Sequence, residues 1–267
     1  MRQALGWLRR GAWGALAGAV LFSLPAAARD VAPHRAIYDL SLMQASKSSG
    51  VVDAKGQMLV ELGDSCDGWT LDQRYRLTLT DTESDESLLV VTSSSWESKD
   101  GLGYRFFIRK LQDGDVTEEK RGRAQLPAPG AAGAAAFTQP DSFTVDLPAG
   151  TMFPTEHTLL LIRAAEQNQR FVSKKVFDGD STEGPSEVTA AIGQATDAPA
   201  AGKPLLARRS WAMRLAYYKP DAAGAEPIYE VGMRLLDNGV AEALTLDYGD
   251  FVVRAKLREI ESTKPDC

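Results

Sequence analysis

Hydrophobic and polar positions alternate with a period of two residues along most of the chain. Such alternation predicts β-strands that bury one face, because successive side chains of a strand point to opposite faces. Residues 69–80, 104–111 and 211–218 show the pattern most clearly. Their predicted buried faces consist of Trp69, Leu71, Tyr75, Leu77 and Leu79, of Tyr104, Phe106 and Ile108, and of Trp211, Met213, Leu215 and Tyr217.

Turn signals separate these runs at short intervals. Asp-Gly pairs begin at Asp67, Asp113 and Asp178. The Asn-Gly pair at residues 238–239 predicts a hairpin with a type I′ turn, which requires positive φ angles. Residues 248–262 predict a long final strand. About a dozen strands are expected in all, which favours a barrel, a sandwich or a strongly bent, spiral antiparallel sheet.

One segment departs from the period of two. Residues 153–170, FPTEHTLLLIRAAEQNQR, contain good helix formers with Leu159, Ile162 and Ala165 on one side. They predict a single amphipathic helix laid against the sheet, with Thr155 as its N-cap.

Two stretches rich in small residues and proline, 126–136 and 195–204, are expected to be loops. Strand patterns resume on both sides of each stretch. We therefore expect an all-β protein with a single domain over residues 29–267.

Residues 1–28 have the three parts of a secretory signal peptide: basic residues, a short apolar run over 11–24, and small residues up to Ala28. We expect cleavage after Ala28 and a protein that is exported to the periplasm and does not span the membrane. The apolar run falls short of the ~20 residues that a membrane span needs. A buried N-terminal helix is the alternative. The pair Arg9-Arg10 leaves the choice between the general secretory and twin-arginine routes open.

The charge balance argues against two classes of partner, nucleic acids and anionic membrane surfaces bound through charge. Without the three arginines of residues 1–28, 27 basic residues face 36 acidic ones, which gives a net charge of about −9. Proteins that bind nucleic acid need basic stripes to neutralise phosphates. No nucleic-acid partner is expected.

The chain has two cysteines, Cys66 and Cys267, and the second is the last residue. Export exposes them to an oxidising compartment, where cysteines pair. We predict a structural Cys66–Cys267 disulfide; the alternative is two free thiols. The sequence has no C-x-x-C motif that would indicate redox catalysis.

Candidate catalytic and metal-binding residues are few. His34 and His157 are expected to be solvated or hydrogen-bonded, and the sequence has no further histidine. Gly63-Asp64-Ser65 resembles the start of an esterase motif but lacks the late Asp and His that such an enzyme needs. Residues 178–184 gather three carboxylates without the spacing of a calcium loop. We expect no enzyme activity, no cofactor and no metal; Ser65 and the carboxylates Asp178, Asp180 and Glu183 are the alternatives.

Aromatic side chains recur on the predicted strand faces. In a closed and filled sheet they would form the core, whereas in an open sheet they would line an apolar groove for a lipid tail or a partner segment. The candidate groove residues are Trp69, Tyr75, Trp96, Tyr104, Phe106, Trp211 and Tyr217.

Several stretches together resemble one protein family. They are residues 137–168, residues 176–184 (VFDGDSTEG), Cys66 ahead of a Gly-Trp strand, and the terminal Cys267. They resemble the EipB family of periplasmic cell-envelope integrity proteins. The resemblance implies a spiral, strongly bent sheet that a Cys66–Cys267 disulfide closes. It also implies a role in envelope integrity without enzymatic activity, and a periplasmic repeat protein as a partner.

Three functional hypotheses follow. The first is a non-enzymatic periplasmic protein that supports envelope integrity by binding envelope proteins. The second is a carrier that holds a lipid or lipoprotein acyl chain in a half-barrel groove, by fold analogy with periplasmic lipoprotein carriers. The third, a hydrolase that uses Ser65 or the 178–183 carboxylates, ranks last.

Overall fold

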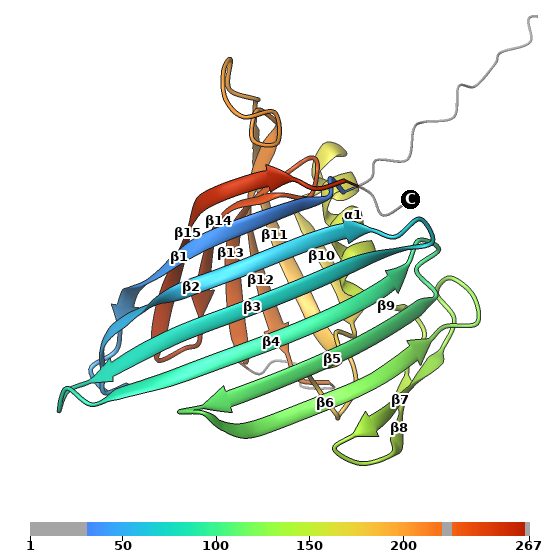
Figure 1. Ribbon diagram of the computed structural model, residues 1–267. Coiled ribbons are helices and arrows are strands. Elements are labelled where there is room, and N and C mark those ends of the chain that lie inside the picture. Colours follow the sequence, from blue (N-terminus) through green and yellow to red (C-terminus); the bar gives the residue numbers. More distant parts are fainter. Residues whose placement is uncertain (1–30, 221–225, 265–267) are drawn as a thin grey trace, which may run out of the picture.

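The computed structural model describes residues 31–220 and 226–264, and these residues form fifteen β-strands in one sheet (Figure 1). The expected all-β class is confirmed, with more strands than the dozen expected. In chain order the elements are β1 (His34–Ala45), β2 (Val51–Asp64), β3 (Gly68–Asp81), β4 (Glu86–Ser98), β5 (Gly103–Gln112), β6 (Asp115–Gln125), β7 (Gly133–Gln139), β8 (Phe143–Leu147), β9 (Thr151–Met152), α1 (Pro154–Glu166), β10 (Phe171–Val176), β11 (Ser186–Thr196), β12 (Ser210–Tyr218), β13 (Tyr229–Leu236), β14 (Ala241–Asp247) and β15 (Phe251–Ser262).

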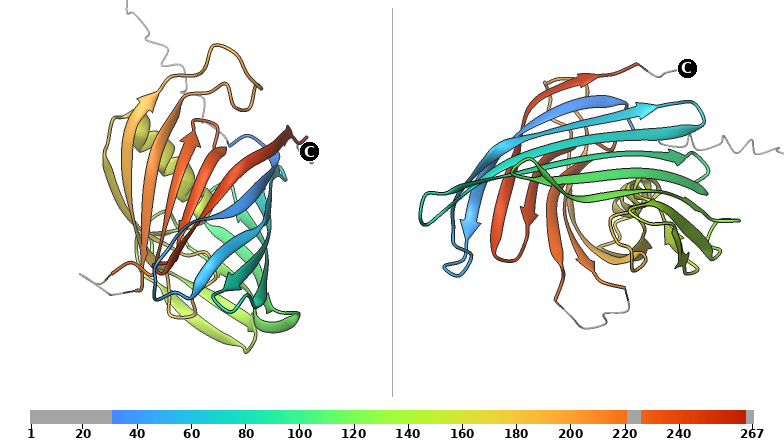
Figure 2. Two further views of the ribbon diagram at one scale, coloured as in Figure 1. Left: turned by 90° about the vertical axis from the view of Figure 1, so that its left-hand side faces the viewer. Right: turned by 60° about the horizontal axis from the view of Figure 1, so that its bottom comes forward.

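The first and last strands meet in the middle of the sheet. Its order runs from β8 back to β1, continues with β15, and runs back to β9. Neighbouring strands are antiparallel except for the short parallel pair β9–β10. The sheet curls until its two ends, β8 and β9, come to the same side, so the molecule is barrel-like and nearly closed (Figure 2).

The alternation in the sequence correctly identified the inner faces of the strands. In β3, Trp69 and Leu77 are buried while Arg74 and Arg76 are exposed. Buried and exposed positions alternate in the same way through β5 and β12. A half-buried strand in a curled sheet has one inner and one outer face, so a local pattern suffices to orient it.

Helix α1 begins two residues earlier than the sequence indicated. Its N-cap residue is Phe153, which makes no side-chain capping hydrogen bond, and Pro154 occupies the first turn. The expected N-cap Thr155 therefore lies inside the helix, and that prediction is wrong. Proline at the first helical position has its φ already set for a helix and lacks an N–H that would need a partner.

The hairpin between β13 and β14 was placed correctly, but its turn differs from the expected type I′. Gly239 has a φ of +83°, whereas Asn238 keeps a negative φ. The amide of Leu236 donates to the carbonyl of Val240, which leaves a three-residue loop. The side-chain amide of Asn238 donates to the Leu205 carbonyl at 3.0 Å, and this contact with a distant loop holds Asn238 in place.

The loop expected over residues 126–136 ends early, because β7 already begins at Gly133. A Cβ at Gly133 would lie 2.2 Å from the Gln125 carbonyl, so β6 and β7 approach too closely for a side chain there. The small residues that suggested a loop are instead the residues that a crowded strand pair requires.

The core forms separate clusters along the curl. One lies between α1 and β10–β13 and includes Leu161, Ile162 and Trp211. Another lies between β5–β8 and the segments after β9 and β10. Within the described residues, α1 is thirteen residues long, and no helix is long and apolar enough to cross a membrane.

Candidate functional site

The curled sheet encloses a cavity of about 620 Å³. This volume lies within the range of pockets that hold small molecules. Its walls come from strands on both sides of the curl and from the N-terminal part of α1. The lining residues are mainly Val31, Tyr38, Met58, Val60, Leu62, Leu71, Tyr75, Leu89, Val91, Pro154, Tyr217, Tyr229, Val231, Leu244, Leu246 and Tyr248, with His34, Gln73, Ser93, Lys110, Thr155, Thr158, Asp180 and Asp247 among the polar groups.

The cavity has a closed end and an open end. Val31 and Leu62, at the closed end, pack with Leu159 of α1 and are almost fully buried. At the open end, Tyr248 is 43% exposed and the Asp180 side chain is 49% exposed. We call this open end the mouth, with Lys110, Asp180 and Tyr248 as its defining residues.

Strand register explains why the apolar wall of the cavity has a lysine ammonium group at the mouth. Met58, Tyr75, Val91 and Lys110 occupy directly opposed positions on β2, β3, β4 and β5. Opposed residues of paired strands point to the same face, so these four side chains form one row across the inner surface. Three of them present mainly apolar surface, and the fourth brings an ammonium group to the mouth.

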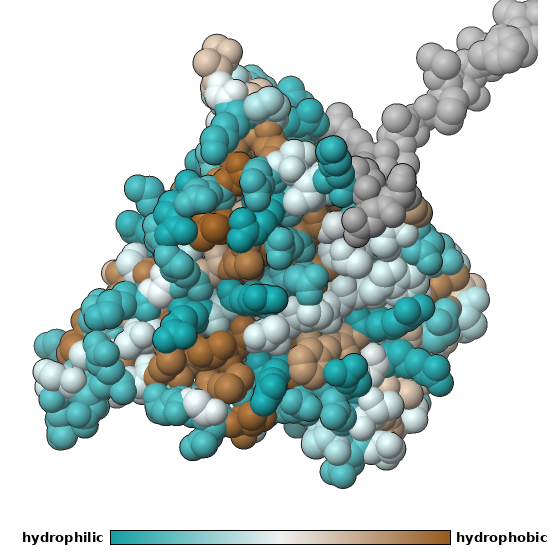
Figure 3. Space-filling view, viewed as in Figure 1, coloured by the Kyte–Doolittle hydropathy of each residue, from teal (hydrophilic) through white to brown (hydrophobic). Residues whose placement is uncertain are grey.

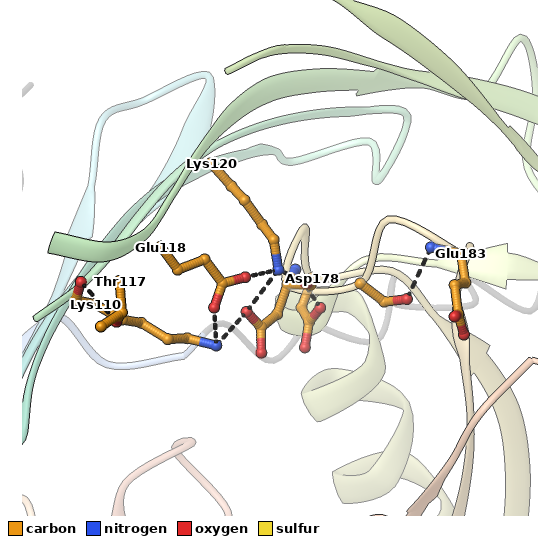
Figure 4. A network of polar contacts seen from close by, with 8 residues as sticks. Lys110, Thr117, Glu118, Lys120, Asp178 and Glu183 are labelled. Atoms are coloured by element: carbon orange, nitrogen blue, oxygen red, sulfur yellow. Dashed lines mark hydrogen bonds and ion pairs between the residues drawn. The ribbon is translucent and has the colours of Figure 1, made fainter. Parts of the chain in front are cut away.

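An ion-pair network crosses the mouth (Figure 4). The Lys110 ammonium lies 2.9 Å from the Glu118 carboxylate and 2.8 Å from the Asp180 carboxylate. Lys120 contacts the same two carboxylates. Burial opposes the charge on Lys110, but the Asp180 and Glu118 carboxylates outweigh it and raise its pKa above the ordinary value. The network balances its charges and joins β5 and β6 to the segment that follows β10.

The three carboxylates that suggested calcium take separate roles in the structure. Asp180 forms ion pairs with Lys110 and Lys120. The Asp178 carboxylate accepts a hydrogen bond from the backbone amide of Asp180 at 3.0 Å. The Glu183 amide donates to the Ser181 hydroxyl at 3.1 Å. Over residues 31–220 and 226–264, no group of three or more His, Cys, Asp or Glu side chains is placed to hold a metal ion.

Five tyrosines give the cavity amphipathic walls, and four of them meet in pairs. The rings of Tyr217 and Tyr229 stack with their centroids 4.2 Å apart, and the hydroxyl oxygens of Tyr75 and Tyr248 lie 3.5 Å apart. Burial raises the pKa of the Tyr75, Tyr217 and Tyr229 phenols, so they stay neutral. A neutral tyrosine offers an apolar ring and one polar hydroxyl, which suits a ligand with an apolar body.

A buried carboxylate anchors the helical wall of the cavity. Both oxygens of Glu97 on β4 accept hydrogen bonds at 2.7 Å, one from the Thr155 amide and one from the Glu156 amide. Burial raises the pKa of Glu97 to about 7, against the opposing effect of the two amides. Glu97 thus takes the capping role that sequence analysis gave to Thr155. It joins residues nearly sixty positions apart, which no local sequence signal reveals.

Both histidines are buried, contrary to expectation for solvated residues. The Nε2 of His157 on α1 has no hydrogen-bond partner, and burial lowers the pKa of this histidine to about 4. The Nδ1 of His34 lies 2.7 Å from the Ala32 carbonyl, and burial lowers its pKa as well. The inward face of α1 and the pairing of β1 on both sides account for their burial.

The seven candidate groove residues separate into three groups. Tyr75 and Tyr217 line the cavity. Trp96 lies on the outer face with its ring 4.4 Å from the Arg105 guanidinium. Trp69, Tyr104, Phe106 and Trp211 are packed in core clusters.

Sequence analysis missed several cavity residues. Tyr38 and Tyr229 belong to strands whose alternation would have indicated them. The mouth residue Lys110 carries no local signal, because it is an ordinary surface-type residue. The sequence indicated Asp180 only as a candidate calcium-binding or catalytic carboxylate, and its place at the mouth depends on its distant partners Lys110 and Lys120.

Ser65 lies in the turn between β2 and β3. Its hydroxyl donates to the Gly68 carbonyl at 3.1 Å and accepts from the Trp96 indole at 3.2 Å. The hydroxyl thus stabilises the turn that carries Cys66.

Residues 1–28 and Cys267 lie outside the described residues, so the signal peptide and the Cys66–Cys267 disulfide stay predictions. The end of β15 nevertheless lies beside β2. The Thr263 hydroxyl donates to the Leu62 carbonyl at 3.4 Å, four residues before Cys66.

Comparisons with known proteins agree on one family. A family model described as EipB-like matches residues 25–264. The chain is 31% identical over 256 residues to the cell envelope integrity protein EipB of Brucella abortus (strain 2308), covering 93% of this chain and 89% of that protein. It also superposes with a TM-score of 0.81 and 30% identity on a crystal structure of a β-barrel-like protein of a domain of unknown function, DUF1849, from Brucella abortus, which covers 89% of this chain and all of the other.

Proposed function

Because the chain belongs to the EipB-like family, we propose that it supports the integrity of the cell envelope after export to the periplasm, and that it does so by binding rather than by catalysis. A relative that is 31% identical is named a cell envelope integrity protein. The mature protein would comprise residues 29–267 as one domain. Its partners would be periplasmic envelope proteins, a repeat protein among them.

The cavity is the observation that carries this proposal. It is an apolar hollow of about 620 Å³ whose mouth is bordered by charge-balanced ion pairs and tyrosines. A hollow of this kind can take up an apolar segment of a partner and leave the polar part of that partner at the rim.

The same hollow favours a second candidate function, the carriage of a lipid or lipoprotein acyl chain. Met58, Val60 and Leu71 present hydrocarbon surface on one wall, and Val231 and Leu246 present it on another. An acyl chain would gain the transfer free energy of each methylene that leaves water, about 0.8 kcal/mol.

The test combines a cavity variant with a matched control in cells that lack the native gene. Leu244→Trp would fill the cavity, while Ala243→Trp places the same ring on the exposed outer face of the same strand. We expect Leu244→Trp to fail to restore detergent resistance and Ala243→Trp to restore it. Full restoration by Leu244→Trp would show that the cavity is not used.

Native mass spectrometry of the protein purified from the periplasm separates the two candidates. A lipid-sized mass that denaturation removes supports the carrier, whereas a bare chain with a co-purifying envelope protein supports partner binding. The same spectrum tests the processing. We expect the mass of residues 29–267 less two hydrogens if the signal peptide is removed and the disulfide forms.

A further inference from the structure

The outer face of β3–β6 carries a concentration of arginines that contrasts with the acidic chain. Six arginines point outward from β3, β5 and β6, on both sides of β4, and all six are exposed. The chain as a whole has a formal net charge of −6. The arginines are Arg74 and Arg76 on β3, Arg105 and Arg109 on β5, and Arg121 and Arg123 on β6.

Most of this charge is not neutralised within the described residues. Arg109 pairs with Glu119 at 3.4 Å, and the Arg121 Nε donates to the Gln139 side chain at 3.2 Å. The remaining four arginines form no ion pair within the part of the chain that the structure describes. Arginines on other strands behave differently: Arg214 pairs with Glu230, and Arg258 pairs with Asp39 at 3.0 Å.

The register makes the arrangement unfavourable for the isolated protein. Arg105 on β5 lies directly opposite Arg123 on β6. Like charges at directly opposed positions destabilise a strand pair. The Arg105–Arg123 pair therefore adds local positive charge that does not contribute to the stability of the fold.

Aromatic rings hold two of the guanidinium groups against the sheet. The Arg105 guanidinium lies 4.4 Å from the Trp96 ring, and the Arg121 guanidinium lies 4.7 Å from the Phe107 ring. A guanidinium that stacks on a ring keeps its N–H edges free in the plane. Such edges suit bidentate hydrogen bonds to phosphate oxygens.

Apolar side chains adjoin the arginines on the same face. Leu88 and Val90 of β4, Leu111 of β5 and Val116 of β6 point outward, and Val116 is 48% exposed. Figure 3 shows brown, hydrophobic surface gathered over the β4–β6 part of this face, with teal, hydrophilic groups around it. Contiguous exposed apolar surface is typical of interaction sites.

We propose that this outer face of β3–β6, which we call the arginine face, docks on a membrane surface that contains anionic phospholipids. The arginines would bind lipid phosphates, and Leu88, Val90, Leu111 and Val116 would enter the boundary between headgroups and acyl chains. Binding of this type depends on apolar area plus attraction between cations and anionic lipids. The apolar component favours a bilayer over a soluble anionic polymer, which offers only charge.

This proposal goes beyond the proposed function and is independent of the cavity. The arginine face lies on the outer side of β3–β6, whereas the cavity lies on their inner side. A protein docked through the arginine face would hold the mouth of the cavity close to the bilayer plane.

The test is flotation of the mature protein with phosphatidylcholine vesicles that contain or lack phosphatidylglycerol. We expect binding to the anionic vesicles that weakens as salt is raised. The double variant Arg105→Glu with Arg123→Glu should weaken this binding about tenfold or more. Its two glutamates keep the cross-strand pair equally charged, and Arg105→Gln with Arg123→Gln serves as a milder second variant.

A matched control changes the same net charge elsewhere. Arg254 and Lys256 are exposed on the outer face of β15, and their double change to Glu should leave vesicle binding close to that of the unaltered protein. Val116→Ser should weaken binding several-fold at high salt, where the apolar contribution dominates. No binding to anionic vesicles, or an equal loss in the β15 variant, would overturn the proposal. Dextran sulfate binding as tight as vesicle binding, with no effect of Val116→Ser, would also overturn it and indicate a soluble anionic partner.

Discussion

The curled sheet has two joins that close it in different ways. At the first join, β1 and β15 pair through backbone hydrogen bonds from His34–Ser262 to Ala45–Phe251. At the second join, β8 and β9 are the ends of the sheet and do not pair with each other within the described residues. Side chains close this second join instead.

The side chains at the second join are mainly aromatic. The rings of Tyr104 and Phe153 stack with their centroids 5.1 Å apart, and Phe106 meets Phe177 edge-on at 5.7 Å. Beside this cluster, Glu97 binds the first amides of α1.

The different closure of the two joins explains why one part of the interior is packed and another part contains a cavity. Backbone pairing closes a sheet without filling its interior, so the region beneath β1–β3 and β13–β15 keeps room for the cavity beside a core cluster that includes Leu40, Leu77 and Val253. Closure by side chains consumes the interior, so the region near β5–β8 and α1 is packed. Interiors of this kind approach crystal density.

The largest effect expected concerns the backbone-paired join. Cys66→Ser or Cys267→Ser should release the chain end that follows β15, where Thr263 lies beside β2. Chain-entropy arguments for a loop of this length give about 5 kcal/mol, or a fall in melting temperature of about 10–20 °C. Thermal melts of both variants measure it, with reductant on the unaltered protein as the control. A melting curve that neither reductant nor substitution moves would show that no such bridge forms.

The second prediction contrasts the packed join with the hollow. Phe153→Ala removes a fully buried ring from the aromatic cluster and should lower the free energy of unfolding by about 3–5 kcal/mol. Leu246→Ala, in the cavity wall, should cost about 1 kcal/mol, because that side chain already borders empty space. Urea unfolding of the two variants measures the difference. Equal losses would mean that the two regions are packed alike.

The third prediction concerns the pH dependence that His157 brings to the packed join. Its pKa is about 4 in the folded protein and 6.5 in the unfolded chain, because burial disfavours the charged ring. The unfolded chain therefore takes up a proton first, and stability is lost as pH falls from 6.5 towards 4, by up to about 3 kcal/mol. Unfolding at pH 7 and at pH 4.5 should show this loss in the unaltered protein. In His157→Leu the loss should shrink; an unchanged acid loss would assign it to other groups.

The smallest effect expected comes from Glu97. Its folded pKa of about 7 exceeds the ordinary 4.5, so the folded protein holds this proton more tightly. The resulting stability is present below pH 4.5 and is lost as pH rises through about 7, opposite in sign to the contribution of His157. Glu97→Gln replaces one acceptor by a donor and should cost about 1–2 kcal/mol at pH 5. That cost should shrink by pH 8, and a cost that grows with pH would contradict the raised pKa.

Local patterns in the sequence identified the elements that depend on neighbouring residues. The alternation in β3, β5 and β12 is a property of a few consecutive positions, and so are the amphipathic helix and the Asn238-Gly239 hairpin. The errors arose where a distant partner decided the outcome. Glu97 displaced Thr155 as the cap, and contact with Leu205 changed the turn at Asn238.

The sequence predicted that aromatic side chains would line the candidate site, but it did not predict which of them. The seven aromatic residues were expected to lie together, either in a core or along a groove. In the structure, Tyr75 and Tyr217 line the cavity, whereas Tyr104 and Phe106 fill the packed join. All four face inward, and alternation correctly indicates that. Whether an inward side chain packs against another one depends on the distance between the facing strands of the curled sheet at that position.

Local alternation is enough to tell which side chains face inward, because a strand reverses the direction of its side chains at every residue. Which of these side chains pack and which border a hollow depends on contacts between distant parts of the fold. That outcome depends on how far the sheet curls, where α1 lies inside it, and which join is closed by side chains. The arginine face follows the same rule: alternation turns each arginine outward, but only the register of β3–β6 gathers the arginines into one surface.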